Sequence, residues 1–378
     1  MGNRDEHGRG NQGNAQAADR ARPAEPDPLA GTPYRTLGKL GAGSMGLVLE
    51  AEHRTIQKRV VVKILHAHLV THADLVDRMH LEARSLAALD GHPNIVAVTD
   101  FGATATGRPY FVMERLVGRT LLAERKKAGR LPPALAIDFT CQALAGLAAA
   151  HAAGIVHRDV KPANLFLCDA TPGRRRVLKV LDFGVAKLVG AAGDRAPTVA
   201  AREHATEEKA IVGTIPYLAP EQVVGGEVDA RTDLYAMGAV LFSLLTGRAP
   251  FEHHPTQNDM LRAHLVEPPR APSELAGLAI PAALDRAVLR ALAKDPHDRF
   301  PDAKAFADEL ARVAGELPPR DAATTPEPPP LREPPSTERR RPARLPGSVA
   351  TPLTLALVWL VSMATTVALG RIVTEVLR

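Results

Sequence analysis

The sequence predicts an α+β protein in which strands come first, helices follow, and one apolar segment lies near the end of the chain. Short runs of β-branched and alternating apolar residues occur between residues 34 and 116, whereas apolar residues at helical spacing dominate from 133 to 317. No charged residue occurs in 349–370. The 378 residues are 45% hydrophobic, which is ample for a large core.

The composition excludes several classes of protein. Much of the net charge of +5 comes from arginines in the flanking segments, so no compact basic module predicts nucleic-acid binding. Cys141 and Cys168 are the two cysteines, and neither belongs to a CxxC or Cys/His cluster. This pattern argues against a disulfide framework and a zinc site, and it fits a reducing compartment.

Three flanking segments are not expected to form domains. Residues 1–33 carry almost no large apolar side chains and predict a disordered tail. Residues 318–348 are crowded with proline and arginine, which favours an extended spacer. Residues 371–378 form a short tail after the apolar segment.

The first strands enclose a glycine-rich turn. Gly41, Gly43 and Gly46 form a GxGxxG pattern, which dinucleotide-binding turns share, but such a turn must open a helix and meet an acidic residue about 20 positions on. Here residues 47–51 alternate as a strand, and a β-branched strand ending in Lys63 follows. The sequence therefore predicts a hairpin over phosphates with a cation beneath it.

Four further elements follow in order. Residues 72–89 have helical spacing and contain Glu82, and residues 110–116 read as a buried strand that leads into a connector. Residues 133–153 form an alanine-rich helix that ends at a glycine. The helix that Asp233 opens ends at 246–247 and, at about 13 residues, is too short to span a bilayer.

The predicted function depends on residues 157–164, His-Arg-Asp-Val-Lys-Pro-Ala-Asn, and on Asp-Phe-Gly at 182–184. Phosphoryl transfer needs a carboxylate to orient a hydroxyl, cations on the moving phosphate, and Mg²⁺ that bridges the phosphates. Asp159 can accept the hydroxyl proton, and Lys161 can neutralise the γ-phosphate. Asn164 can hold one Mg²⁺ through its amide oxygen, and Asp182 can hold the other through its carboxylate.

These motifs resemble, in order and spacing, those of the protein kinase family from about Tyr34 to Leu317. Among its members, the chain looks most similar to bacterial membrane-bound serine/threonine kinases of the eukaryotic type. The resemblance implies a bilobal protein-kinase fold in one domain, 34–317, with a small β-rich N-lobe (34–116) and a larger helical C-lobe (117–317). It also implies ATP and Mg²⁺, or Mn²⁺ in its place, as cofactors.

The same resemblance assigns the nucleotide site. Lys63 would grip the α- and β-phosphates, and Glu82 would hold Lys63. Met113 would be the gatekeeper beside the adenine, although a core methionine in a plain edge strand remains the alternative. Backbone groups of Glu114 and Leu116 would bond the base. The other ATP-binding residues belong to the glycine-rich hairpin and the strand behind it: Leu40, Gly41, Ala42, Gly43, Ser44, Met45, Gly46, Leu47, Val48 and Val61.

Other residues would have structural or regulatory roles. Thr198 and Thr206 follow the Asp-Phe-Gly motif and are candidate phosphosites that Arg158 would bind. Solvated threonines, with the acidic residues of the same loop supplying the negative charge, are the alternative. By resemblance, Thr214 is the substrate-loop threonine near the catalytic residues.

Two pairings come from the resemblance alone. Glu221 would pair with Arg299, and Asp233 would brace the backbone of the catalytic loop.

The resulting expectation is an enzyme that transfers the γ-phosphoryl group of MgATP to serine or threonine hydroxyls of proteins, including itself. Lys161 and Pro162 favour a serine/threonine acceptor over tyrosine. A membrane-anchored pseudokinase scaffold is the alternative. A phosphotransferase for small molecules is disfavoured because the Ala-Pro-Glu element at 219–221 and Thr214 serve a peptide substrate in the family.

The apolar segment 349–370 predicts a transmembrane helix, since 22 residues make about 33 Å of helix. More arginines precede it than follow it, which places the kinase domain in the cytoplasm and the protein in the cell membrane as a single-pass protein. A buried core helix is the alternative. Homodimers are expected through the kinase domain or a face formed by Ser362, Thr366 and Gly370. Because eight residues follow Gly370, we expect tethering rather than extracellular sensing.

Overall fold

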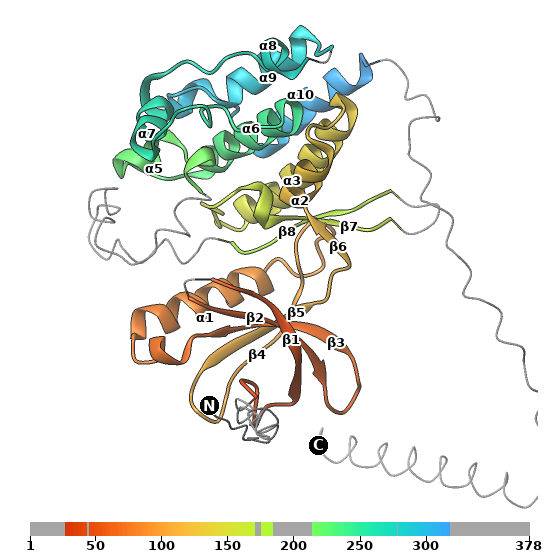
Figure 1. Ribbon diagram of the computed structural model, residues 1–378, viewed down its shortest axis with the longest axis vertical. Helices are drawn as coiled ribbons and strands as arrows, with labels where there is room; N and C mark the ends of the chain where they lie inside the picture. Colours follow the sequence, from red (N-terminus) through yellow and green to blue (C-terminus); the bar gives the residue numbers. More distant parts are fainter. Residues whose placement is uncertain (1–26, 44, 171–174, 184–213, 278, 318–378) are drawn as a thin grey trace, which may run out of the picture. The chain divides into compact units, whose positions relative to one another are not determined.

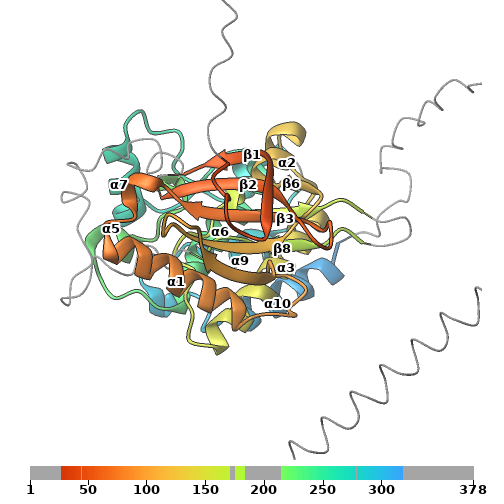
Figure 2. The ribbon, with the colours of Figure 1, turned by 90° about the horizontal axis from the view of Figure 1, so that it is seen from below.

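The computed structural model describes residues 27–43, 45–170, 175–183, 214–277 and 279–317. The N-lobe contains an antiparallel five-stranded sheet in the order β1-β2-β3-β5-β4 and a helix, α1, that packs against β4 and β5 (Figures 1 and 2). Its elements are β1 (Tyr34–Ala42), β2 (Gly46–His53), β3 (Arg59–Leu65), the 3₁₀ turn η1 (Ala67–Leu69), α1 (Ala73–Ala87), β4 (Val98–Ala103) and β5 (Pro109–Glu114).

Strand β3 shows why this sheet forms. Val60, Val62 and Ile64 alternate into a core with β1, β2 and β5, where they are at most 4% exposed. Lys63 points to the opposite face and is paired in register with Val48 on β2 and Phe111 on β5. The period-two pattern therefore directs Lys63 away from the core of the sheet.

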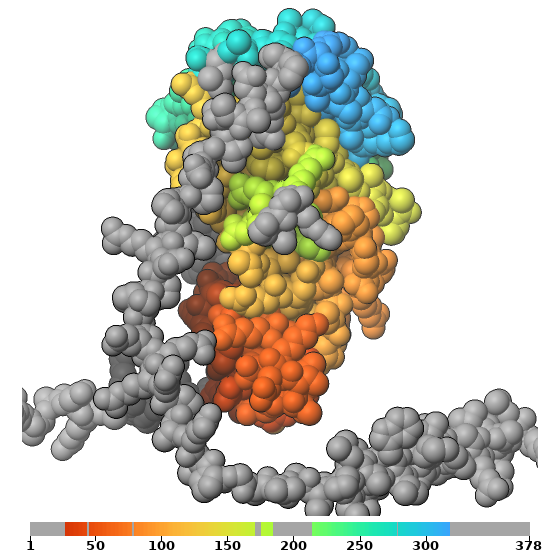
Figure 3. Space-filling model, turned by 90° about the vertical axis from the view of Figure 1, so that its right-hand side faces the viewer, coloured from red at the N-terminus to blue at the C-terminus, as the bar shows by residue number. Residues whose placement is uncertain are grey.

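The C-lobe is mainly helical and also contains a three-stranded sheet in the order β6-β7-β8. Its elements are β6 (Gly118–Thr120), α2 (Leu121–Ala128), α3 (Pro133–Ala152), η2 (Pro162–Asn164), β7 (Leu165–Cys168), β8 (Leu178–Val180), η5 (Ile215–Tyr217), α5 (Pro220–Val224), α6 (Ala230–Thr246), α7 (Gln257–Val266), α8 (Pro272–Ala276), α9 (Ala282–Ala291), η6 (Pro296–Asp298) and α10 (Ala303–Gly315). In Figure 3 the N-lobe, in red to orange, and α10, in blue, lie at opposite ends of the visible face.

Helix α6 forms the centre of the C-lobe and is buried from Thr232 to Leu245. It begins at Ala230, three residues earlier than expected, because the side chain of Asp229 accepts a hydrogen bond from the N–H of Arg231 and caps the helix. Helices α3, α9 and α10 pack around it. A sequence apolar on all sides is therefore explained by burial on all sides.

Among the described residues, α3 is the one helix long and apolar enough to cross a membrane. Half of it is buried within the protein, against α6 and α10, so it is a core helix of the C-lobe. The predicted span at 349–370, the spacer at 318–348 and the tail at 371–378 lie outside the described residues.

The prediction of a disordered tail through residue 33 was wrong for residues 27–33. Leu29 is fully buried in the N-lobe core, and the hydroxyl of Thr32 donates to its carbonyl at 2.8 Å. Asp27 accepts hydrogen bonds from the N–H of Leu29 at 3.0 Å and the hydroxyl of Thr36 at 2.6 Å. The segment contains few large apolar residues, and one isolated leucine forms no periodic pattern, so nothing in its sequence indicated that it is ordered. Residues 1–26 lie outside the described part.

Candidate active site

The glycine-rich turn joins β1 to β2. The N–H of Gly43 donates to the carbonyl of Gly46 at 2.9 Å. A Cβ at Gly46 would collide with the carbonyl oxygen of Ile64 on β3, so close approach of the two strands requires glycine there. A Cβ at Gly41 or Gly43 would meet nothing within 4 Å. Of the predicted residues, Leu40, Gly41 and Ala42 lie on β1, Met45 in the turn, and Gly46, Leu47 and Val48 on β2; Ser44 is outside the described residues.

Lys63 on β3 joins both lobes. Its Nζ lies 2.6 Å from Oε1 of Glu82 on α1 and 3.1 Å from Oδ1 of Asp182, which follows β8. The predicted ion pair is thus present in the structure, and the first residue of the Asp-Phe-Gly motif joins it. Val61 lies two residues earlier on the same strand and is half-buried on the same face.

Charge stabilises this cluster although it is buried. Burial lowers the pKa of Lys63, but the carboxylates of Asp182 and Glu82 outweigh that effect and raise this pKa above its ordinary value. Burial raises the pKa of Glu82, and Lys63 opposes the rise. We assign both groups as ionised because a 2.6 Å contact is typical of a charge-assisted hydrogen bond.

The catalytic loop brings a carboxylate, an ammonium group and a hydroxyl together. Lys161 Nζ lies 2.9 Å from Oδ2 of Asp159 and donates to the hydroxyl of Thr214 at 2.8 Å. That hydroxyl in turn lies 3.3 Å from Oδ1 of Asp159. Asn164, in η2, donates from Nδ2 to the backbone carbonyl of Asp159 at 2.9 Å and to Oδ2 at 3.2 Å. Asp159, Lys161, Asn164 and Thr214 therefore form one polar cluster.

Asn164 and Asp182 each offer an oxygen ligand that suits Mg²⁺. Because Nδ2 of Asn164 is directed at Asp159, its amide oxygen faces away from that residue, and it accepts no hydrogen bond from the described part of the chain. The side chain of Asp182 is 45% exposed and uses only Oδ1 towards Lys63. One amide oxygen and one carboxylate suit Mg²⁺, which keeps water and phosphate oxygens as its other ligands.

Asp233, at the start of α6, holds the backbone of the catalytic loop. Its two carboxylate oxygens each accept a backbone N–H at 2.8 Å, one from His157 and one from Arg158. His151 on α3 contacts Oδ2 as well, at 2.7 Å. Arg158 has a φ of 63° and Asp182 a φ of 43°, both in the left-handed region. Both conformations are strained for non-glycine residues; Asp233 holds Arg158, and Lys63 contacts Asp182.

Glu221 on α5 and Arg299 after η6 form a buried two-pronged pair, with both contacts at 2.8 Å. The hydroxyl of Thr232 also donates to Glu221, at 2.7 Å. Burial raises the pKa of Glu221, but the hydrogen bonds and charge of Arg299 lower it below its ordinary value overall. Gln222 then donates to the carbonyl of Arg158 at 2.9 Å, which links α5 to the catalytic loop.

The predicted adenine contacts lie where β5 leaves the N-lobe. Met113 is 9% exposed and is paired with Val61 on β3 and Val98 on β4. Glu114 ends the strand; its N–H bonds to Ala97, and its side chain contacts Lys179 at 2.8 Å. Leu116 follows and packs partly buried against the main core. The backbone N–H of Glu114 is thus already used within the N-lobe, and adenine binding by the backbone of Glu114 and Leu116 stays a prediction.

Sequence reasoning missed the roles of three residues. His151 and Gln222 hold the catalytic loop from α3 and α5, and no local motif marks either of them. His157 was visible in the motif, but its task was not: it is fully buried, bonds to the carbonyl of Leu181 at 2.9 Å, and packs on Phe183 with ring centres 4.7 Å apart. The predicted phosphosites Thr198 and Thr206 lie outside the described residues.

Comparison with known proteins identifies the family. The family model described as the protein kinase domain matches residues 34–308. Serine/threonine-protein kinase Pkn1 of Myxococcus xanthus is 43% identical over 293 residues, which are 77% of this chain and 40% of Pkn1. Serine/threonine-protein kinase PknB of Mycobacterium leprae is 38% identical over 284 residues, 74% of this chain and 43% of PknB.

The fold agrees with these matches. The crystal structure of the Mycobacterium tuberculosis PknI kinase domain superposes with a TM-score of 0.54 and 26% identity, covering 75% of this chain and 96% of that one. This chain spans 40 to 51% of the length of the first curated relatives that it matches. The extent of the family match, the bilobal fold and the arrangement of the catalytic loop together establish that the chain belongs to the protein kinase family.

Proposed function

We propose that this chain is an ATP-dependent serine/threonine protein kinase. The observation that carries the proposal is the position of a threonine hydroxyl between the two catalytic groups. The Thr214 hydroxyl lies 3.3 Å from the carboxylate of Asp159 and 2.8 Å from the ammonium group of Lys161. A site that already accommodates such a hydroxyl suits an acceptor of the same chemistry. The similar proteins Pkn1 and PknB are named serine/threonine-protein kinases, which supports the same acceptor class.

The proposed reaction is a direct displacement. The acceptor hydroxyl oxygen forms a bond to the γ-phosphorus of ATP, the bond from that phosphorus to the β-phosphate oxygen breaks, and Asp159 takes the hydroxyl proton. Lys161 neutralises the charge that develops on the γ-phosphoryl group, and Lys63, fixed by Glu82, positions the α- and β-phosphates. Mg²⁺, or Mn²⁺ in its place, supplies further charge neutralisation when held by Asn164 and Asp182.

We also propose that residues 349–370 anchor the protein in the cell membrane, with the kinase domain on the cytoplasmic side. The uncharged segment and the excess of preceding arginines support this proposal. We propose in addition that the partners of the chain are protein substrates and a second copy of itself. The two copies would pair through the kinase domain or through the face formed by Ser362, Thr366 and Gly370.

The test of the kinase proposal uses the full-length protein with γ-labelled ATP and Mg²⁺, a generic basic protein as acceptor, and an Asp159→Asn control. We expect label on serine and threonine in the wild-type reaction, and a loss of roughly 10²- to 10⁴-fold in the control, the range that general-base catalysis contributes. Equal label in both proteins would contradict the role of Asp159. Nucleotide binding without any transfer would favour the scaffold alternative.

A further inference from the structure

We propose that His253, His254 and Glu267 form a binding site for a divalent transition-metal ion of the zinc class, and that the ion joins the two ends of α7. The two histidines lie shortly before that helix, which is capped by Thr256, and Glu267 follows its last residue. None of the three belongs to the catalytic cluster.

The geometry of these side chains is that of a chelating group. Nε2 of His254 lies 2.8 Å from Oε2 of Glu267, and Nε2 of His253 lies 3.8 Å from Oε1. The two imidazole centroids are 4.3 Å apart, and all three ligand atoms lie within 4.8 Å of one another. Successive side chains in an extended chain point to opposite sides, but the turn closed by the His254 N–H on the Phe251 carbonyl, at 3.2 Å, brings both rings to one carboxylate.

The ligand set selects the class of ion. Two imidazole nitrogens and one carboxylate suit zinc and its neighbours in the first transition series, whereas Mg²⁺ prefers oxygen ligands alone. Ligand atoms about 2 Å from a tetrahedral zinc ion lie about 3.3 Å from each other. The distances of 2.8 Å from His254 to Oε2 and 3.8 Å from His253 to Oε1, the two oxygens of the Glu267 carboxylate, lie on either side of that value. The side chains are 46%, 24% and 37% exposed, so small rotations can equalise the distances and water can supply a fourth ligand.

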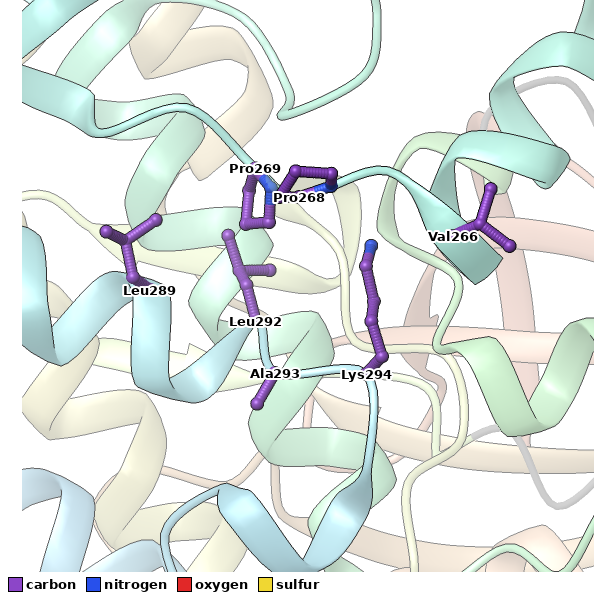
Figure 4. Close-up of a pocket in the computed structure, with 7 residues that line it drawn as sticks. All are labelled: Val266, Pro268, Pro269, Leu289, Leu292, Ala293 and Lys294. Carbon is purple, nitrogen blue, oxygen red and sulfur yellow. The ribbon is translucent and has the colours of Figure 1, made fainter.

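The positive charge of the nearby Lys294 disfavours binding of a metal ion, but Lys294 does not pair with any of the three proposed ligands. Lys294 lies beside Val266 and Pro268, the neighbours of Glu267, where they border a pocket of about 350 Å³ (Figure 4). Its Nζ donates to the backbone carbonyls of Ala263 at 3.1 Å and His264 at 2.9 Å. Lys294 therefore caps the carboxyl end of α7, and within the described residues it forms no ion pair with Glu267.

Metal binding at this site would affect the structure around α7. Binding would close the segment from His254 to Glu267 into a loop that contains all of α7. Between these ends α7 packs against η5, where Leu261 forms a buried cluster with Ile215 and Leu218. An ion that fixes α7 would therefore also stabilise η5, which directly follows Thr214.

The test measures binding of the metal alone, so it does not depend on the proposed kinase activity. Full-length protein is titrated with Zn²⁺ against a chromophoric chelator, and Co²⁺ absorption reports the ligand geometry. The variants are His254→Ala, the near-isosteric Glu267→Gln, and His68→Ala as the control. His68 belongs to a different pair of neighbouring imidazoles, stacked on His66 at 5.4 Å, which forms no three-ligand cluster among the described residues.

We expect one tight zinc ion per chain, at least about tenfold weaker binding in both site variants, and unchanged binding in the control. Zinc should raise the melting temperature of the wild type and of His68→Ala only. Equal affinity in wild type and Glu267→Gln would place the ion elsewhere and overturn the proposal. If zinc did not bind with micromolar affinity, the three side chains would form only a histidine–carboxylate hydrogen bond, and the proposal would be overturned as well.

Discussion

Replacing Arg299 with methionine should destabilise the kinase domain strongly, because it leaves a buried carboxylate without its partner. The guanidinium group has no exposed surface, and the Glu221 side chain is 9% exposed. Arg299 also donates to the backbone carbonyls of Ala293, Arg231 and Lys294 at 2.9, 3.0 and 3.1 Å. The substitution removes all of these hydrogen bonds at once.

The expected loss is about 3 to 5 kcal/mol, the usual effect of removing one partner of a buried ion pair. A domain of this size has an entropy of unfolding of about 0.6 kcal/mol/K, so the melting temperature should fall by about 5 to 8 °C. Activity should fall further than the folded fraction does, because Gln222 on the same short helix holds the carbonyl of Arg158.

The assay is thermal unfolding of the wild type, Arg299→Met, Glu221→Met and the double variant. The double variant should lose less stability than the two single losses added together, because neither charge is then left alone. Arg312→Met is the matched surface control: its pair with Glu309 involves a side chain that is 50% exposed, and we expect a change of about 1 °C or less. A similar small change in Arg299→Met would refute the reasoning.

Three further outcomes are expected. Gly46→Ala should lower the melting temperature and weaken ATP binding because its Cβ collides with the β3 backbone, whereas Gly41→Ala, which meets nothing within 4 Å, should leave stability unchanged. Burial of His264 lowers the pKa of its imidazole to about 3, so the unfolded state binds more protons than the folded state between pH 3 and 6.5. The free energy of unfolding, measured with urea, should therefore fall by about 1.4 kcal/mol per pH unit as the pH drops below 6.5. Arg125→Met removes a buried side chain that donates to the Tyr217 hydroxyl at 3.2 Å in the substrate loop, and it should raise the KM for a peptide several-fold while the KM for ATP stays constant in steady-state assays.

Each of these expectations has its own contrary result. Equal melting temperatures for the two glycine variants would show that the hairpin tolerates the added Cβ. A His264→Asn variant with the same acid slope as the wild type would assign that slope to other groups. If the KM for ATP rose in parallel with the KM for peptide in Arg125→Met, the residue would support the fold rather than the substrate loop.

Most of the fold and of the candidate site could be predicted from the local spacing of residues in the sequence. The run of β-branched residues Val60–Val62 before Lys63 predicted a strand, and the structure confirms it as part of β3. The catalytic loop could be located because Asp159, Lys161 and Asn164 lie within six residues. The partners Glu82 and Arg299 came from family resemblance, since a lone glutamate or arginine carries no spacing signal.

Contacts between distant parts of the chain were not predictable in this way. His151 reaches Asp233 across 82 positions, and Arg125 reaches Tyr217 across 92. Such pairs depend on how α2 and α3 pack against the other elements of the C-lobe, and hydrophobic periodicity does not specify that packing. The single Leu29 that anchors the segment before β1 was missed for the same reason: its partners lie on other strands.

The most direct test of the account is a single-turnover measurement of γ-phosphoryl transfer at saturating MgATP, with ATP affinity measured on the same samples. We predict that Asp159→Asn binds ATP like the wild type but transfers the phosphoryl group to serine or threonine at least about 10²-fold more slowly. An unchanged transfer rate in Asp159→Asn, or transfer by neither protein while both bind ATP, would contradict the proposal that this site is a working protein kinase.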